Sequence, residues 1–280
     1  MRRALPSIVV TNEHLLEKGA ELDFLVANER IYLAKTLSVQ DFEDYGRRDY
    51  QRPARLLRIG MLPPKVAQIM INLAYGSLGR ASKGPKNAIL DPFVGSGTVL
   101  QEAMLMGYKA VGSDISEKAV ESTEKNLEWI KNRYKIPPAR FDLFVSDVAD
   151  IIPNLPDFAY EAIVTEGTLG PAYTKSPDEE EIKKNFKNLE KIYLAAFRVF
   201  KKILKPDKRV VIALPAYRNR NTYRFMPIVD KIVKLGYDVV NPVPEVLRER
   251  FEFLQVSSRG SIVYDRKDQF VSREIFIFKI

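Results

Sequence analysis

The stretch Asp91-Pro92-Phe93-Val94-Gly95-Ser96-Gly97-Thr98 decides the fold that we predict for this chain. It lies between a short apolar run at 87–90, typical of a buried strand, and an amphipathic run at 98–106, typical of a helix. A glycine-containing loop between a parallel strand and the next helix lies where doubly wound α/β sheets bind their ligands. The stretch therefore predicts an α/β fold with a ligand site at this loop.

The composition of this loop discriminates between ligands. Gly95 and Gly97 allow a tight turn and a close approach of backbone to ligand. The loop has neither the Gly-Lys-Ser/Thr ending of a P-loop nor the Gly-x-Gly-x-x-Gly spacing of a dinucleotide site, which disfavours nucleotide hydrolysis and hydride transfer. Asp91 would repel a phosphate and favours an ammonium or sulfonium group, and S-adenosylmethionine carries both. Thr98 and Gln101 match a capping box at the helix start.

Alternating apolar and amphipathic runs continue on both sides of the loop. Strands are expected at 87–90, 109–112, 141–146, 161–165 and 209–214, with helices at 98–106, 116–134 and 178–204. After these come a helix at 222–235, a strand at 237–240 and a final strand pair at 261–264 and 273–280. The pattern predicts a mostly parallel twisted sheet with an antiparallel terminal strand.

The beginning of the chain follows another pattern. Apolar runs at 22–27 and 30–37 predict a β-hairpin within a small N-terminal β element at 1–45. Residues 46–60 are expected to be a linker that opens the larger domain, 46–280, and Pro63-Pro64 is expected to open its first helix.

Composition excludes several classes of function. The 280 residues contain no cysteine and one histidine, which excludes disulfides, thiolate zinc sites, iron–sulfur clusters and cysteine nucleophiles, and predicts no metal site. No apolar run approaches the roughly 18 residues of a membrane span, so we expect a soluble, cytoplasmic protein. The net charge of +8 fits an anionic partner such as nucleic acid.

Two further acidic residues follow the next strands. Asp114 can accept hydrogen bonds from both hydroxyls of a ribose, with Ile115 against an adenine ring. Asp147 can accept from the adenine amino group while the amide of Val148 donates to the ring. Each aspartate alone could instead be a helix cap or part of a turn, but three acids at successive strand ends favour a nucleoside cofactor.

The loop at 91–98 resembles the cofactor loop of class I S-adenosylmethionine-dependent amino-methyltransferases. The segments Arg48-Asp49-Tyr50-Gln51-Arg52-Pro53 and Gly60-Met61-Leu62-Pro63-Pro64-Lys65 resemble, more narrowly, the tRNA guanosine-N2 methyltransferases usually associated with THUMP domains. The resemblance covers about residues 45–280 and implies a Rossmann-like class I methyltransferase fold. The implied cofactor is S-adenosylmethionine, with Leu62, Asp91, Pro92, Phe93, Gly95, Ser96, Gly97, Thr98, Asp114, Ile115, Asp147 and Val148 as its binding residues.

In that family an Asp-Pro-Pro-Tyr motif after the fourth strand binds the target amine. Here Glu166 stands at the position of the Asp and Gly167 at that of the first Pro. The resemblance implies that the Glu166 carboxylate and the Gly167 carbonyl are the catalytic acceptors, which hold the amine in line with the methyl group. Tyr173 either supplies the missing aromatic ring or packs in the core.

The implied substrate is tRNA, but the residues before 46 are too few for a THUMP module. RNA recognition is therefore expected from the larger domain, the N-terminal element or a partner subunit. Candidate contacts are Arg48 and Arg52 in the basic cluster 47–58, and Arg218 and Arg220 after the fifth strand, although either cluster could be a solvated charge run.

Three functions stay open, in this order. The first is methylation of an exocyclic amine in RNA, with guanosine N2 in tRNA as the leading target. The second is methylation of adenine N6 or cytosine N4 in DNA, and the third is a cofactor-binding subunit that has lost catalysis.

Overall fold

The computed structural model describes residues 5–55, 60–75, 87–137, 141–171, 173, 175–219, 222–243, 247, 256–266 and 269–280. The contacts divide the chain into two compact units, Met1–Gln51 and Arg52–Ile280. The division falls within the segment expected to be a linker. Among the described residues, no helix combines the length and the apolar character that crossing a membrane would require.

The N-terminal unit contains the predicted hairpin. Strand β1 (Leu22–Ala27) pairs antiparallel with β2 (Arg30–Lys35). The two turn residues, Asn28 and Glu29, have φ values of 48° and 62°, as a tight hairpin turn requires. A short helix, α1 (Ser7–Asn12), precedes the hairpin.

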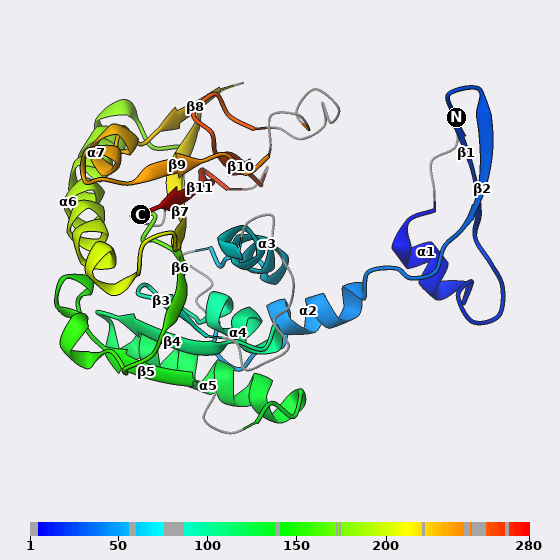
Figure 1. Cartoon of the computed structure of the whole chain (residues 1–280), viewed down its shortest axis with the longest axis horizontal. Helices are drawn as coiled ribbons and strands as arrows, with labels where there is room; N and C mark the ends of the chain where they lie inside the picture. Colours follow the sequence, from blue (N-terminus) through cyan, green and yellow to red (C-terminus); the bar gives the residue numbers. More distant parts are fainter. Residues whose placement is uncertain are drawn as a thin grey trace. The chain divides into compact units, whose positions relative to one another are not determined.

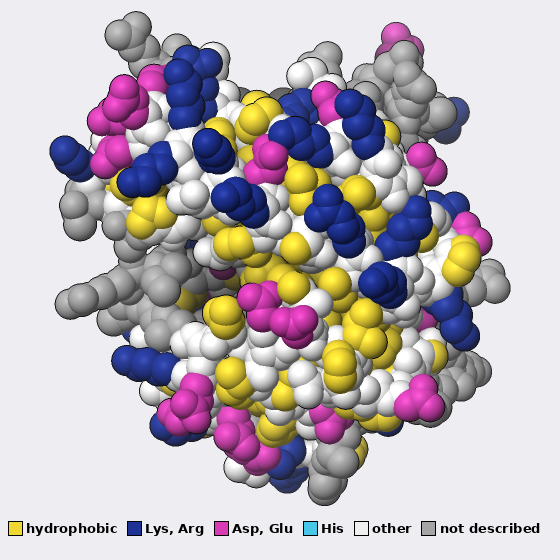
Figure 2. Space-filling view, turned by 90° about the vertical axis from the view of Figure 1, so that its left-hand side faces the viewer, with side chains coloured by type: hydrophobic (Ala, Val, Ile, Leu, Met, Phe, Trp, Pro, Cys, Tyr) yellow, Lys and Arg dark blue, Asp and Glu magenta, His cyan; other side chains and the backbone are white. Residues whose placement is uncertain are grey.

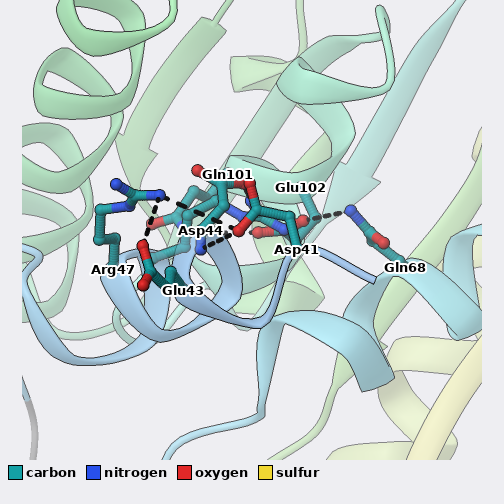
Figure 3. A network of polar contacts seen from close by, with 8 residues as sticks. Asp41, Glu43, Asp44, Arg47, Gln68, Gln101 and Glu102 are labelled. Atoms are coloured by element: carbon teal, nitrogen blue, oxygen red, sulfur yellow. Dashed lines mark hydrogen bonds and ion pairs between the residues drawn. The ribbon is translucent and has the colours of Figure 1, made fainter. Parts of the chain in front are cut away.

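The first part of the expected linker is helical. Helix α2 (Phe42–Tyr50) begins at the cap Asp41, whose side chain accepts a hydrogen bond of 2.8 Å from the Asp44 amide. Arg47 Nη2 lies 4.0 Å from carboxylate oxygens of both Asp41 and Glu43, as Figure 3 shows. Glu43 and Arg47 lie one turn apart, and such a pair of opposite charges stabilises a helix.

The larger unit is built on one nine-stranded sheet (Figure 1). Its parallel part has the order β7-β6-β3-β4-β5, formed by Arg209–Asn219, Tyr160–Glu166, Ala88–Asp91, Lys109–Asp114 and Phe141–Val145. Its antiparallel part adds β11 (Val271–Lys279) beside β7, with β10 (Ile262–Tyr264) and β9 (Asp238–Val240) paired to β11. The predicted α/β class and the antiparallel final strands are confirmed.

Helices cover both faces of this sheet (Figure 1). On one face α6 (Glu179–Ile203) and α7 (Val229–Lys234) pack a core that includes Phe197, Phe200 and Phe278. On the other face lie α3 (Pro64–Tyr75), α4 (Thr98–Leu105) and α5 (Glu117–Arg133). Gln68 of α3 donates a 2.7 Å hydrogen bond to Glu102 of α4 (Figure 3). Two short 3₁₀ turns, Val148–Asp150 and Ile152–Asn154, follow β5.

The prediction of a helix at 222–235 is wrong for the first half of that range. Thr222–Phe225 forms the strand β8, which pairs antiparallel with the extended end of β7. The exposure of its side chains alternates, as on a half-buried strand. A helix forms only after Pro227, at Val229–Lys234. Backbone pairing with β7 therefore outweighs the helical spacing of the apolar residues.

The N-terminus of α6 generates a test of stability. Asp178 accepts hydrogen bonds from the amides of Glu180 and Glu181, and the Glu181 side chain accepts from the Asp178 amide. Asp178→Ala should lower the free energy of unfolding by about 1 kcal/mol and the midpoint of thermal unfolding by roughly 2 to 4 °C. Asp178→Asn should retain most of the stability, because asparagine also caps helices. Equal losses for the two variants in thermal unfolding would contradict this account of the cap.

Candidate functional site

A cavity of about 1060 Å³ opens at the carboxyl ends of the parallel strands. Loops after β3, β4, β5 and β6 line it, together with residues 60–62 and one side of α6. The sequence-predicted residues in its lining are Leu62, Asp91, Pro92, Phe93, Gly95, Ser96, Thr98, Asp114, Ile115, Asp147, Val148, Glu166 and Gly167. The cavity thus occupies the crevice expected for a ligand of a doubly wound sheet.

Gly97 lies behind the lining, where its role is conformational. It is the N-cap of α4 with a φ of 80°, in the left-handed region that favours glycine. A Cβ atom there would also lie 2.7 Å from Thr123 Cγ2 of α5. The capping box expected from Thr98 and Gln101 is absent, because Gly97 rather than Thr98 is the N-cap of α4. The Thr98 hydroxyl accepts a 2.7 Å hydrogen bond from Arg52.

Side chains of α5 hold the glycine loop from below. The Thr123 hydroxyl donates to the Gly95 carbonyl at 3.2 Å, and Asn126 Nδ2 donates to the Ser96 carbonyl at 2.8 Å. The Gly95 amide donates to Asp114 Oδ2 at 3.1 Å. These bonds leave the loop with a defined backbone before any ligand arrives.

Asp91 is a buried carboxylate at the floor of the cavity. Its Oδ1 accepts hydrogen bonds from the Thr165 hydroxyl at 2.6 Å and from the Phe93 amide at 3.2 Å. Burial raises its pKa to about 7, against the effect of these two bonds. Among the described residues no lysine or arginine forms an ion pair with it, so the charge that would favour its ionised form must come from a ligand.

Asp114 and Asp147 occupy the next two strand ends. Asp114 lines the cavity beside the exposed side chain of Ile115, and its Oδ1 accepts a 3.0 Å hydrogen bond from the Ser116 amide. Asp147 also lines the cavity, and its Oδ1 accepts from the Ala149 amide at 2.8 Å. Asp147 is therefore a cap of the first 3₁₀ turn, the alternative role that its position allowed.

The Glu166 carboxylate forms an ion pair with Arg273 of β11. Burial raises the pKa of Glu166, and the adjacent guanidinium opposes this rise. Gly167 lies so close to α6 that a Cβ atom would be 2.4 Å from Tyr193 Cε1. Tyr193 also donates to the Thr168 carbonyl at 2.6 Å, and Asn185 donates to the Leu169 carbonyl at 3.2 Å. Helix α6 thus fixes the loop after β6.

The residues expected to bind substrate lie in several places. Tyr173 is outside the cavity lining and packs edge-on against Tyr217, with ring centroids 5.9 Å apart. Arg218 forms an ion pair with Asp265. Arg48 belongs to the N-terminal unit, where it pairs with Asp44. Arg220, like residues 56–59 of the first basic cluster, lies outside the described residues.

Arg52 is not exposed, as a contact with the RNA backbone would require. Its side chain is buried, and its guanidinium donates to the Thr98 hydroxyl at 2.7 Å and to the sulfur of Met61 at 2.9 Å. The arginine thus joins the segment 60–62 to the start of α4, two parts of the cavity lining.

Some lining residues were missed by the sequence analysis. They are Arg55, Gly60, Met61, Val94, Val99, Ser116, Lys118, Ala119, Ser146, Ala149, Thr168, Leu169, Lys191, Ile192 and Ala195. Met61 and Val94 lie in segments that the sequence had singled out, so adjacency could have found them. The α6 residues carry no such signal, because only packing brings that helix to the cavity.

Comparison with known proteins places these features in a family. The family model described as DNA methylase matches residues 65–125. A tRNA (guanine(10)-N2)-dimethyltransferase of Pyrococcus abyssi is 36% identical over 147 residues, 52% of this chain and 38% of that protein. A probable tRNA (guanine(10)-N2)-dimethyltransferase of Methanothermococcus thermolithotrophicus is 30% identical over 122 residues, 43% of this chain and 70% of that protein. This chain belongs to the tRNA (guanine(10)-N2)-dimethyltransferase family.

The chain spans only part of the longer members of this family. The matched region covers 38% of the Pyrococcus abyssi protein and 42% of the Methanothermobacter thermautotrophicus protein, which is 34% identical.

Solved structures support the fold. TrmN from Thermus thermophilus has a TM-score of 0.52 at 16% identity, covering 93% of this chain and 59% of that one. NSun6 from Pyrococcus horikoshii also has a TM-score of 0.52, at 11% identity, covering 90% of this chain and 60% of that one. The fold is the Rossmann-like class I methyltransferase fold.

The environment of Asp91 generates a test of the site's electrostatics. The Thr165 hydroxyl stabilises the ionised carboxylate, so Thr165→Val should raise the pKa of Asp91 further above its value of about 7. Thr165→Ser retains the hydroxyl and should leave the pKa close to that of the unmodified protein. Carboxyl ¹³C NMR titration measures both. An unchanged pKa in the valine variant would contradict the role of this hydrogen bond.

Proposed function

We propose that this chain transfers a methyl group from S-adenosylmethionine to N2 of a guanosine in tRNA. One observation carries the proposal: the carboxyl ends of three parallel strands bring Asp91, Asp114 and Glu166 to the wall of one cavity, in a chain of this family. The volume of this cavity, about 1060 Å³, slightly exceeds the roughly 300–1,000 Å³ of most ligand pockets, which suits a cofactor that must meet a base.

The residues present fit this cofactor. Asp91 is a buried carboxylate without a cationic partner in the described part of the chain, and the ammonium group of the cofactor would supply one. Asp114 would accept hydrogen bonds from the ribose hydroxyls, with Ile115 and Val148 beside the adenine. When bound, the cofactor supplies an electrophilic methyl group on a sulfonium. Asp91 and Asp114 would orient it through both of its ends.

Glu166 and Gly167 would act on the target amine. The lone pair of an exocyclic amine is delocalised into the base, so the nitrogen needs acceptors that favour a pyramidal geometry. The Glu166 carboxylate and the Gly167 carbonyl would each accept a hydrogen bond from one of the two N–H groups of the amine. As the N–C bond forms and the S–C bond breaks, the nitrogen loses a proton, for which Glu166 is the acceptor. The base must leave its stack to reach them, at a cost of a few kcal/mol.

The acceptor role of Glu166 gives the first test. With labelled cofactor and unmodified total tRNA, the chain should produce labelled N2-methylguanosine in nucleoside analysis. Glu166→Gln should lower kcat by about 10²-fold or more, because glutamine cannot take the proton. Glu161→Gln on the same strand, where Glu161 pairs with Lys208, is the matched control and should retain activity. Full activity of Glu166→Gln would overturn the assignment.

A second candidate substrate is DNA, because the matched family model is described as a DNA methylase. The same assay with duplex DNA in place of tRNA separates the two substrates. Label in DNA alone would replace the tRNA proposal, and cofactor binding without transfer to either acceptor would favour a subunit that has lost catalysis.

For the RNA backbone we propose the lysines of α6 rather than the arginines considered from the sequence. Figure 2 shows the face of the molecule on which α6 and α7 lie, and Lys and Arg side chains gather over that part of it. Lys184, Lys187 and Lys191 share one side of α6, and Lys191 lines the cavity. Among the described residues these three have no acidic partner, whereas Lys231 nearby pairs with Glu190. They would lead phosphates toward the cavity mouth.

This surface gives a second test. The double substitution of Lys184 and Lys187 by Gln should raise KM for tRNA several-fold. It should also lower the slope of log affinity against log salt by roughly 0.7 to 0.9 for each phosphate that the lysines no longer neutralise. Substituting Lys202 and Lys205, exposed at the other end of α6, is the matched control. Equal effects of the two pairs would show a non-specific loss of charge instead.

A further inference from the structure

Arg273 joins three segments that are far apart in the sequence. It is 1% exposed and extends from β11, the last strand of the chain. Its Nε donates to Glu166, its Nη1 donates to Gln269 Oε1 at 3.0 Å, and its Nη2 donates to the Gly60 carbonyl at 3.0 Å. All three nitrogens of the guanidinium thus have partners, two of which line the cavity.

The geometry across the sheet makes this contact specific. Strand β7 lies between β11 and β6, where Arg273 stands opposite Pro215 and Glu166 stands opposite Ala213. The arginine must therefore extend past β7 to meet the glutamate. A planar guanidinium with several fixed donors holds a carboxylate in one orientation better than an ammonium on a flexible stem.

We propose that Arg273 is a positioning residue that keeps the Glu166 carboxylate ionised and directed toward the target amine. The inference rests on the proposed function of Glu166 as the amine acceptor. Arg273 itself does not line the cavity, so it acts through Glu166.

The charges around Glu166 support this role. Burial raises the pKa of Glu166, and Arg273 is the cation that lowers it. Among the described residues, the other titratable groups that interact with it are Asp91 of β3, where two negative charges disfavour each other, and Tyr193 of α6. Without the guanidinium, Glu166 would be a buried carboxylate beside a second carboxylate. Its protonated form would be favoured, and a protonated carboxyl cannot take a proton from the amine.

The sign of the effect on activity follows. Removing the positive charge raises the pKa of Glu166, so the acidic limb of the pH profile of kcat moves to higher pH. An opposite charge at contact distance lowers the pKa of a carboxyl by about 1 to 3 units, and the limb should move by a similar amount. Activity lost at neutral pH should return as the pH rises above the new pKa.

The experiment compares Arg273→Gln with Arg273→Lys in the full chain. Arg273→Gln should shift the acidic limb upward by at least about one pH unit. Arg273→Lys keeps the charge and should restore most of the wild-type profile. A simple structural role for Arg273 would lower stability in both variants without moving the limb.

Arg259 provides a matched control, because it pairs with a carboxylate of the same strand, β11. It lies 3.2 Å from the buried Glu274 carboxylate and does not line the cavity. Arg259→Gln should lower the thermal midpoint but leave the pH profile of kcat unchanged. An unshifted profile in folded Arg273→Gln, or equal shifts in the Arg259 and Arg273 variants, would overturn the proposal.

A second measurement separates this inference from the proposed function. Carboxyl ¹³C NMR titration of Glu166 should give a higher pKa in Arg273→Gln than in the unmodified protein, and Arg273→Lys should fall between them. If the unmodified chain transfers no methyl group, the proposed function fails, and this titration still decides whether Arg273 keeps Glu166 ionised. An equal Glu166 pKa in all three proteins would overturn the positioning role.

Discussion

The structure depends on the convergence of carboxylates at one edge of a parallel sheet. Because β3, β4 and β6 run in the same direction, their ends bring Asp91, Asp114 and Glu166 to a single cavity. Burying like charges together costs free energy, which local hydrogen bonds and one arginine offset only in part. Burial raises the pKa of Asp91 to about 7, and the nearby carboxylates of Asp114 and Glu166 add to this rise. Such a site favours a cationic ligand, and the segments that line the cavity leave room for one.

The walls of the cavity come from segments that lie far apart in the sequence. Helix α5 supports the glycine loop through Thr123 and Asn126, and Arg52 ties that loop to the segment at 60–62. Helix α6 holds the loop after β6 through Tyr193 and Asn185. These tertiary hydrogen bonds hold a glycine-containing segment in place.

The sequence predicts the features whose cause is local. The glycine loop, the alternation of strands and helices, and the hairpin turn at Asn28 and Glu29 each follow from a few neighbouring residues, and the observed fold confirms them. Features set by distant partners were not predictable. Thr222–Phe225 is a strand because β7 lies beside it, and the Thr98 hydroxyl accepts a hydrogen bond from Arg52, which lies 46 residues earlier in the sequence. The ion pair of Glu166 with Arg273 joins residues on opposite sides of β7, and no local pattern marks it.

A crystal structure with S-adenosylhomocysteine bound tests the central claim most directly. The account predicts its ammonium group against the Asp91 carboxylate, its ribose hydroxyls at Asp114, and its sulfur facing the Glu166 side of the cavity. A ligand bound elsewhere on the protein, or one whose ribose points away from Asp114, would contradict the account.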